Sequence, residues 1–145
     1  MCLYKYRKTI FKRNITCYKV LLINKINDEI QYVSPYQNEP YMIEQIKSID
    51  KNEPEFYTQH IDNREYNLIR GDGLYSYKNL KDAIAECNQK LYSVVVKCII
   101  PKSSKFVYKG HIFYSPYTPA FVSQQLKPIE IVHVKLPMNI PIQFC

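Results

Sequence analysis

The residues best placed to do chemistry lie in a glycine-framed corner that begins at Gly71. Gly71 and Gly73 are two of only three glycines in the 145-residue chain. Glycine permits a tight turn with positive φ and lets a ligand approach the backbone closely. Tyr75 and Ser76 follow in the segment from Leu74 to Tyr77, which is predicted to form a short buried strand. An amphipathic helix is predicted to begin directly afterwards. Since a helix N-terminus presents free N–H groups, the corner predicts a pocket suited to an anion.

Other kinds of reactive site are not indicated by residue type and spacing. The five cysteines are an odd number without a C-x-x-C pair, and the three histidines lack ligand spacing. We therefore expect neither a disulfide scaffold nor a metal site. The corner also lacks the third glycine of a dinucleotide loop and the Gly-Lys-Ser/Thr of a P-loop. Whether the protein is an enzyme stays open, and a non-catalytic role with no cofactor is favoured.

Positive charge is concentrated at the N-terminus. Residues 1–20 contain six of the 20 basic residues and no acid, which leaves 14 basic and 13 acidic residues for the rest of the chain. Aromatic residues are interleaved with these charges, so a basic arm over residues 1–14 could contact phosphates and stack on bases. The favoured alternative is a solvated arm whose aromatics pack on the domain or on a partner. The candidate arm residues are Lys5, Arg7, Lys8, Lys12 and Arg13.

These residues must be positioned by secondary-structure elements, and the pattern of apolar and polar residues predicts what those elements are. It predicts one α+β domain over 15–136, followed by an extended tail over 137–145. Apolar and β-branched runs predict strands at 15–23, 29–33, 55–61, 66–69, 92–100 and 129–136. Helical spacing of apolar residues predicts a helix over 79–89, whose Glu86 faces away from the core, and a short one over about 40–49. A hairpin is predicted about Gly110. We therefore expect a mixed, mostly antiparallel sheet with two or three short helices.

No apolar run approaches 18 residues and no signal peptide is recognisable. We therefore expect a cytoplasmic protein that does not bind membranes.

The corner from Gly71 through Tyr75 resembles the Gly-x-Gly-x-Tyr-strand-helix segment of ADP-ribosyltransferase folds. The resemblance implies a split sheet, with the tyrosine stacked on the nicotinamide of NAD. It also places Lys19 on the first strand, where those enzymes use His or Arg to grip the NAD ribose. Ser34 resembles a serine at a strand end in some members.

Gln124 stands where the same family carries its catalytic glutamate, near the start of the last strand. A neutral amide cannot stabilise an oxocarbenium-like transition state as a carboxylate does. The resemblance therefore implies an inactive copy or one that uses a different acid.

A second resemblance is to small proteins of gut Bacteroidales and their phages, including crAss-like phages. It rests on the Met-Cys-Leu start, Cys17-Tyr18-Lys19-Val20, the segment Tyr32 to Tyr36 and the run from Val95 to Lys102. This group implies a phage-encoded protein in the host cytoplasm or the virion, but no activity.

Three functions follow from these observations. The first is a non-catalytic, phage-encoded protein that acts through protein contacts, either host-directed or virion-associated. The second is an NAD- or ADP-ribose-binding protein, active or vestigial. The third is a nucleic-acid-binding protein that uses the N-terminal arm.

Overall fold

A computed structural model describes residues 2–137, apart from the side chains of Pro116 and Tyr117. This part of the chain forms twelve strands and one helix, and every strand pairing in it is antiparallel. The elements are β1 (Cys2–Lys8), β2 (Ile15–Ile26), β3 (Glu29–Val33), β4 (Pro40–Tyr41), β5 (Lys47–Ser48), β6 (Phe56–Ile61), β7 (Arg64–Arg70), β8 (Leu74–Tyr77), α1 (Leu80–Cys87), β9 (Ser93–Ile100), β10 (Val107–Ile112), β11 (Ser115–Ser123) and β12 (Gln125–Lys135). The predicted tail over 137–145 lies outside the described residues except for Pro137.

The predicted α+β class with a split sheet is wrong, because the described residues form one twelve-stranded sheet and contain a single short helix. The second predicted helix, over about 40–49, does not form. Glu44 has a φ of 69°, which interrupts a right-handed helix. The N–H groups of Glu44 and Ile49 donate to Pro128 and Gln124 instead of to residues four positions earlier. Tertiary hydrogen bonds to the region around the start of β12 have replaced the helical ladder that apolar spacing predicted.

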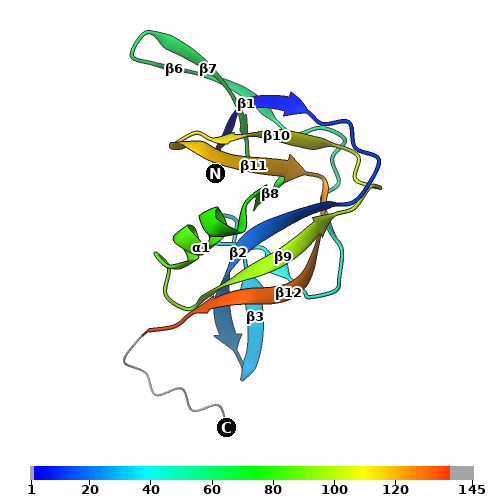
Figure 1. The fold of residues 1–145 in the computed structure, drawn as a ribbon, viewed down its shortest axis with the longest axis vertical. Coiled ribbons are helices and arrows are strands. Elements are labelled where there is room, and N and C mark those ends of the chain that lie inside the picture. The colour runs from blue at the N-terminus through cyan, green and yellow to red at the C-terminus, as the bar shows by residue number, and fades with distance from the viewer. Residues whose placement is uncertain (1, 138–145) are drawn as a thin grey trace.

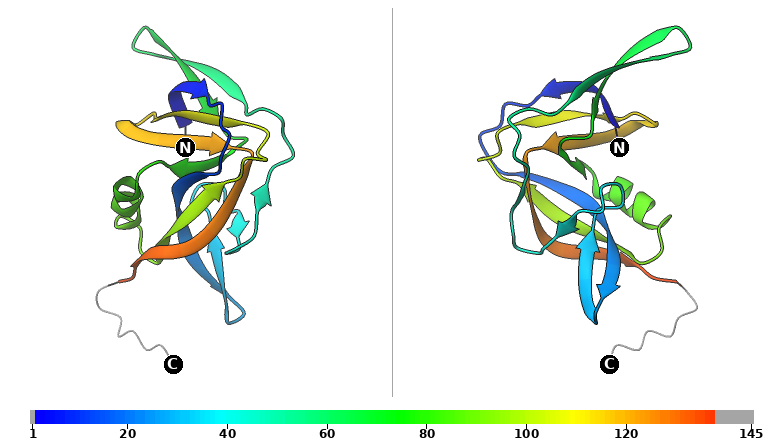
Figure 2. Two further views of the ribbon diagram at one scale, coloured as in Figure 1. Left: turned by 45° about the vertical axis from the view of Figure 1, so that its right-hand side comes forward. Right: turned by 180° about the vertical axis from the view of Figure 1, so that it is seen from behind.

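The sheet runs in the order β5-β12-β9-β2-β8-β11-β10-β1-β7-β6, and β3 adds to β2 with β4 beside it. Figure 1 shows the β2–β3 and β6–β7 hairpins projecting at opposite ends of the molecule. The two views in Figure 2 place α1 against one face of β2 and β9, and the segment that holds β4 and β5 against the other. The sheet is therefore covered on both faces where β2 and β9 pair.

Two apolar clusters hold these layers together. On the side of β4, Leu21, Val96 and Leu126 are buried in the largest cluster. On the side of α1, Ala83 and Val95 are buried in a smaller one. Burying a side chain of this kind stabilises the fold by roughly 1.5–3 kcal/mol, so β2 is fixed from both sides.

The basic N-terminal segment is not a free arm, because residues 2–8 form β1 inside the sheet. β1 pairs with β10 on one edge and with β7 on the other, and Leu3 is fully buried. Gly110 lies within β10 instead of at a hairpin turn, since β10 continues through it to Ile112. A Cβ at Gly110 would lie 2.7 Å from the Tyr4 carbonyl oxygen. Close packing against β1, not turn formation, explains this glycine.

The glycine corner adopts the predicted backbone. Gly71 has a φ of +83°, in the region that favours glycine. Gly73 is required for a different reason, because a Cβ there would collide with the Val122 side chain. All four residues of β8 are buried, as predicted for the strand that follows the corner. The helix then begins at Leu80, one residue later than predicted.

Candidate functional site

A gap in the strand pairing of β2 creates the candidate site. One edge of β2 pairs without interruption with β9 from Ile15 to Leu22. On the other edge, Tyr18 pairs with Tyr77 of β8, and pairing with β3 resumes only at Leu22. Residues 19–21 are therefore left without a strand partner on that edge. Unpaired backbone in an interior needs other polar partners, from side chains, water or a ligand.

A cavity of about 510 Å³ lies at this gap. Its volume is within the range of small-molecule sites in proteins, roughly 300–1,000 Å³. Its walls come from most parts of the chain. The lining residues are Cys2, Lys19, Val20, Ser34, Pro35, Tyr36, Gln37, Gln59, Arg70, Gly71, Tyr75, Ser76, Tyr77, Glu86 and Tyr114. Five of the seven residues predicted from sequence to bind a ligand line this cavity, and the other two, Gly73 and Gln124, do not.

Lys19 occupies the gap itself and is 8% exposed. Its Nζ donates to the backbone carbonyl of Tyr75 at 2.6 Å, so the side chain bonds a β8 carbonyl where the strands have separated. The Nζ also lies 5.3 Å from the ring centre of Tyr41. None of the ion pairs among the described residues involves Lys19. Burial lowers the pKa of its ammonium group to about 8, because the charged form loses hydration.

Ser76 provides an unused hydrogen-bonding group in the same cavity. The residue is 2% exposed, and its hydroxyl has no hydrogen-bond partner. The Cys17 thiol is close enough that Ser76 slightly opposes the burial that raises the pKa of Cys17 to about 12. A thiol is a weak hydrogen-bonding partner, however, and no bond of acceptable geometry forms. A buried, unpartnered hydroxyl that lines a cavity is a position where a polar ligand gains a hydrogen bond without displacing one.

Tyr75 lines the cavity, but its ring lies in the packed interior. It belongs to a core cluster with Leu3, Phe106 and Val122. Its hydroxyl donates to the Ile69 carbonyl oxygen at 3.2 Å, and burial raises its pKa. The stacking role that the resemblance implied for this tyrosine is therefore not supported by its surroundings.

A carboxylate and two tyrosines form another part of the wall. The Tyr36 hydroxyl donates to Glu86 at 3.4 Å. Burial, followed by the nearby Glu86 carboxylate, raises the pKa of Tyr77. Helical spacing predicted that Glu86 faces away from the core, but α1 directs it to this cavity. No pattern within the helix sequence could have revealed this, because the neighbouring wall is Tyr36, fifty positions earlier in the chain.

Ser34 and Gly71, which the sequence predicted to bind a ligand, also line the cavity. Ser34 is buried, and its hydroxyl accepts from the backbone N–H of Gln37 at 3.3 Å in the turn after β3. Gly73 does not line the cavity, although its carbonyl accepts from Gln37 at 3.5 Å. The cavity meets α1 at Glu86 and not at the predicted helix N-terminus.

Gln124 lies elsewhere and has a structural role. Its amide Nε2 donates to the Ile49 carbonyl at 2.9 Å, and its Oε1 accepts from the Lys105 N–H at 3.1 Å. These bonds join Gln124, between β11 and β12, to the residue after β5 and to the loop before β10. Gln124 therefore does not occupy the position of a catalytic acid in this cavity.

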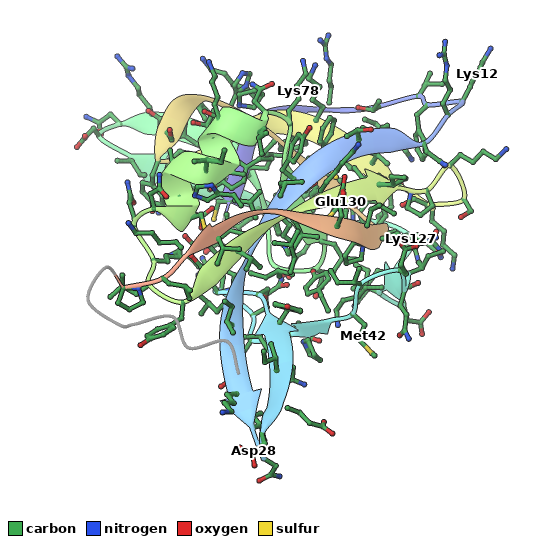
Figure 3. All side chains as sticks on the ribbon, turned by 60° about the horizontal axis from the view of Figure 1, so that its bottom comes forward. Lys12, Asp28, Met42, Lys78, Lys127 and Glu130 are labelled. Carbon is green, nitrogen blue, oxygen red and sulfur yellow. The ribbon has the colours of Figure 1, made fainter. Side chains whose placement is uncertain are left out.

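The predicted arm residues lie in β1 and in the loop that follows it. Lys8 pairs with Glu53 at 2.8 Å, and Lys5 lies over the Tyr4 ring. Figure 3 shows Lys12 extending from the loop after β1. Arg7 lies opposite Lys109 in the β1–β10 ladder. Nucleic-acid contact by these residues stays a prediction.

Lys109 belongs to a small basic group on the sheet. Lys78 first, then burial and Arg7, lower the pKa of Lys109. The three residues come from β1, β10 and the segment between β8 and α1, so only the tertiary structure brings them together.

Searches of protein families, curated proteins and solved structures found no match for this chain. The resemblances to ADP-ribosyltransferases and to Bacteroidales phage proteins therefore stay predictions. Within residues 2–137, no helix is long and apolar enough to span a bilayer. The same part of the chain contains no group of three His, Cys, Asp or Glu side chains arranged to hold a metal ion.

Proposed function

We propose that this protein binds a small nucleotide-type ligand, of the NAD or ADP-ribose class, in the cavity between β8 and β3. The observation that carries the proposal is the unpartnered Ser76 hydroxyl beside a buried cation, Lys19, in a cavity large enough for a ligand. The cost of burying these polar groups is offset if a ligand bonds to them.

The charges of the cavity wall fit the parts of such a ligand. Lys19 and Arg70 are cations suited to a diphosphate. Glu86 is an acceptor suited to ribose hydroxyls. The rings of Tyr36 and Tyr114, at exposed positions on the wall, provide surfaces on which a base can stack.

The test is isothermal titration of the wild type and Ser76→Ala with ADP-ribose and NAD. Loss of one hydrogen bond to a polar ligand group costs about 0.5–1.5 kcal/mol, so the affinity of Ser76→Ala should fall about two- to twelvefold. Its stability should not fall, because the hydroxyl has no partner to lose.

Ser93→Ala is the matched control, with the same atom removed from another buried serine. The Ser93 hydroxyl already bonds to the carbonyls of Cys87 and Lys90. We expect this variant to lose stability and to keep wild-type affinity. Absence of binding to the wild type at millimolar ADP-ribose and NAD would refute the proposed ligand class.

A second candidate function is binding of an extended apolar peptide from a partner protein. A groove of about 810 Å³ runs between the β2–β3 hairpin and the β4–β5 segment. Four of its apolar residues are strongly exposed, namely Ile26, Ile30, Met42 and Ile46. Figure 3 shows the hairpin projecting to Asp28 at its tip, with Met42 on the neighbouring segment.

The outer edge of β3 favours an extended peptide as the occupant. β4 pairs only with Tyr32 and Val33, which leaves the edge open from Glu29 to Gln31. An open edge beside an apolar groove accepts a strand through backbone hydrogen bonds, while the groove selects its side chains.

The test is cross-linking mass spectrometry of the tagged protein in its native host, with Ile30→Glu as the variant. A partner cross-linked to the β2–β3 hairpin of the wild type, and lost in Ile30→Glu, supports this function. Cross-links that persist in the variant, or that map elsewhere, contradict it.

A further inference from the structure

We propose that Lys19 is a nucleophile that forms a reversible imine with an aldehyde, in particular with C1″ of the ring-opened terminal ribose of ADP-ribose. The inference rests on the proposed ligand site, and adds a covalent step to it. The geometry that supports it is an amine held in a cavity, with a single hydrogen-bond acceptor and no carboxylate at ion-pair distance.

An imine-forming lysine must have a free electron pair at the working pH. Burial of Lys19 lowers its pKa to about 8, so a large share of the amine is neutral in mildly alkaline solution. A neutral amine can donate one N–H to the Tyr75 carbonyl, which lies 2.6 Å away, and direct its electron pair elsewhere. Desolvation of this kind is how proteins activate lysine as a nucleophile.

The charged and titratable groups around Lys19 do not restore the ordinary pKa of its ammonium group. Cys17 lies on its own strand, Cys98 is on β9, Glu86 is on α1 and Lys47 is on β5. Cys98, Glu86 and Cys17 raise the pKa of Lys19 and Lys47 lowers it, but loss of hydration exceeds these effects. Burial raises the pKa of both thiols, so Cys17 and Cys98 are themselves neutral near pH 8.

Ser76 is placed to assist the reaction. Tyr18 of β2 lies opposite Tyr77 of β8 in an antiparallel pair. Lys19 and Ser76 therefore occupy the next pair of opposed positions, on the two sides of the gap. Cross-strand neighbours of this kind share one face of a sheet. The unpartnered Ser76 hydroxyl is therefore available to hydrogen-bond the oxygen of the aldehyde.

The reaction is balanced by loss of water. The ammonium first releases a proton to solvent, and the neutral nitrogen then bonds to the aldehyde carbon while the carbonyl electrons move to oxygen. The oxygen takes up a proton while the nitrogen releases one, giving a neutral carbinolamine. The carbinolamine then loses its hydroxyl together with the remaining N–H proton as one molecule of water, which leaves the C=N bond of the imine.

The experiment traps the imine by reduction and compares two ligands of the same class. Wild-type protein is incubated with ADP-ribose or NAD at pH 8 in the presence of cyanoborohydride, and modified peptides are mapped by mass spectrometry. The terminal ribose of ADP-ribose can open to an aldehyde at C1″, whereas the anomeric carbon of each ribose in NAD is blocked by a base. We expect modification at Lys19 by ADP-ribose and none by NAD.

Site selectivity is read within one sample, so it does not depend on a variant that folds. About half of a lysine with a pKa near 8 is neutral at pH 8, against less than about 1% of a lysine at the ordinary value. Modification at Lys19 should therefore exceed that at the exposed Lys102 by about tenfold or more. Lys19→Arg, whose guanidinium cannot form the imine, should lose the adduct.

The outcomes separate this inference from the proposed function. Binding of ADP-ribose and NAD without an adduct at Lys19 overturns the imine and leaves the ligand site intact. Modification spread equally over exposed lysines also overturns it. If neither ligand binds and Lys19 is not modified, both proposals fail.

Discussion

Replacing Lys19 with Met tests the physical state of the buried amine directly. The change keeps a flexible side chain of similar length but removes the ionisable group. The folded wild type holds this group at a pKa of about 8, whereas the value in the unfolded chain is 10.5. The difference corresponds to a cost of about 3 kcal/mol for burying the charged form at neutral pH.

The sign of the pH dependence follows from proton binding. Between about pH 8 and 10.5 the unfolded chain binds more protons at Lys19 than the folded chain, so the free energy of unfolding rises with pH. Integrated from pH 7 to 9, this rise is about 1 kcal/mol. Cys17 and Cys98 act in the opposite direction, because their raised pKa values destabilise the fold as the unfolded thiols ionise near pH 9.

The thiol effect cancels when wild type and variant are compared at the same pH. We therefore expect the wild-type free energy of unfolding minus that of Lys19→Met to increase by about 1 kcal/mol between pH 7 and 9. Urea unfolding measures the free energy of unfolding of each protein at each pH. It is followed by far-UV circular dichroism and by tyrosine fluorescence, because the chain has 14 tyrosines and no tryptophan. Lys102→Met controls for loss of one exposed positive charge. A difference that stays constant across this pH range would show that Lys19 is hydrated and would refute the reasoning.

Three further substitutions test the fold around the site. Gly110→Ala should lower the free energy of unfolding in urea by about 1–3 kcal/mol, because its Cβ would lie 2.7 Å from the Tyr4 carbonyl oxygen. A variant as stable as the wild type would show that β1 does not pack against Gly110. Gln124→Leu should lose about 1–3 kcal/mol by leaving the Ile49 carbonyl without its donor, while calorimetry should find ADP-ribose affinity unchanged; weaker binding would return Gln124 to the site. Leu21→Ala should cost about 2–5 kcal/mol, since the side chain is fully buried, and a loss below 1 kcal/mol by the same assay would contradict the packing of the main core.

The glycine corner shows how far local sequence patterns reach. The positive φ of Gly71, the buried strand after it and the helix that follows were all predictable, because each depends on residues within a few positions. The hairpin turn at Asp62 and Asn63 was predictable for the same reason, and both residues have positive φ as a tight hairpin requires.

The errors arose where distant segments compete with local preference. Apolar spacing over 40–49 is compatible with a helix, but hydrogen bonds to Pro128 and Gln124 hold this segment in a non-helical path. Likewise the N-terminal charges indicated an arm, while burial of Leu3 between β10 and β7 made it a strand. Alternating charged and apolar residues suit a strand with one solvated face, and charge counting does not register this alternation.

By itself the sequence determined several of the strand-forming segments, the turn at Gly71 and the identity of Lys19, Ser34, Gly71 and Ser76 as residues of interest. Only the tertiary structure decided that these residues share one cavity. The reason is that β2 changes partner from β8 to β3 after Tyr18, which leaves residues 19–21 unpaired on that edge. That gap depends on pairing between segments 56 positions apart, the separation of Lys19 and Tyr75, and no local pattern encodes where two such strands part.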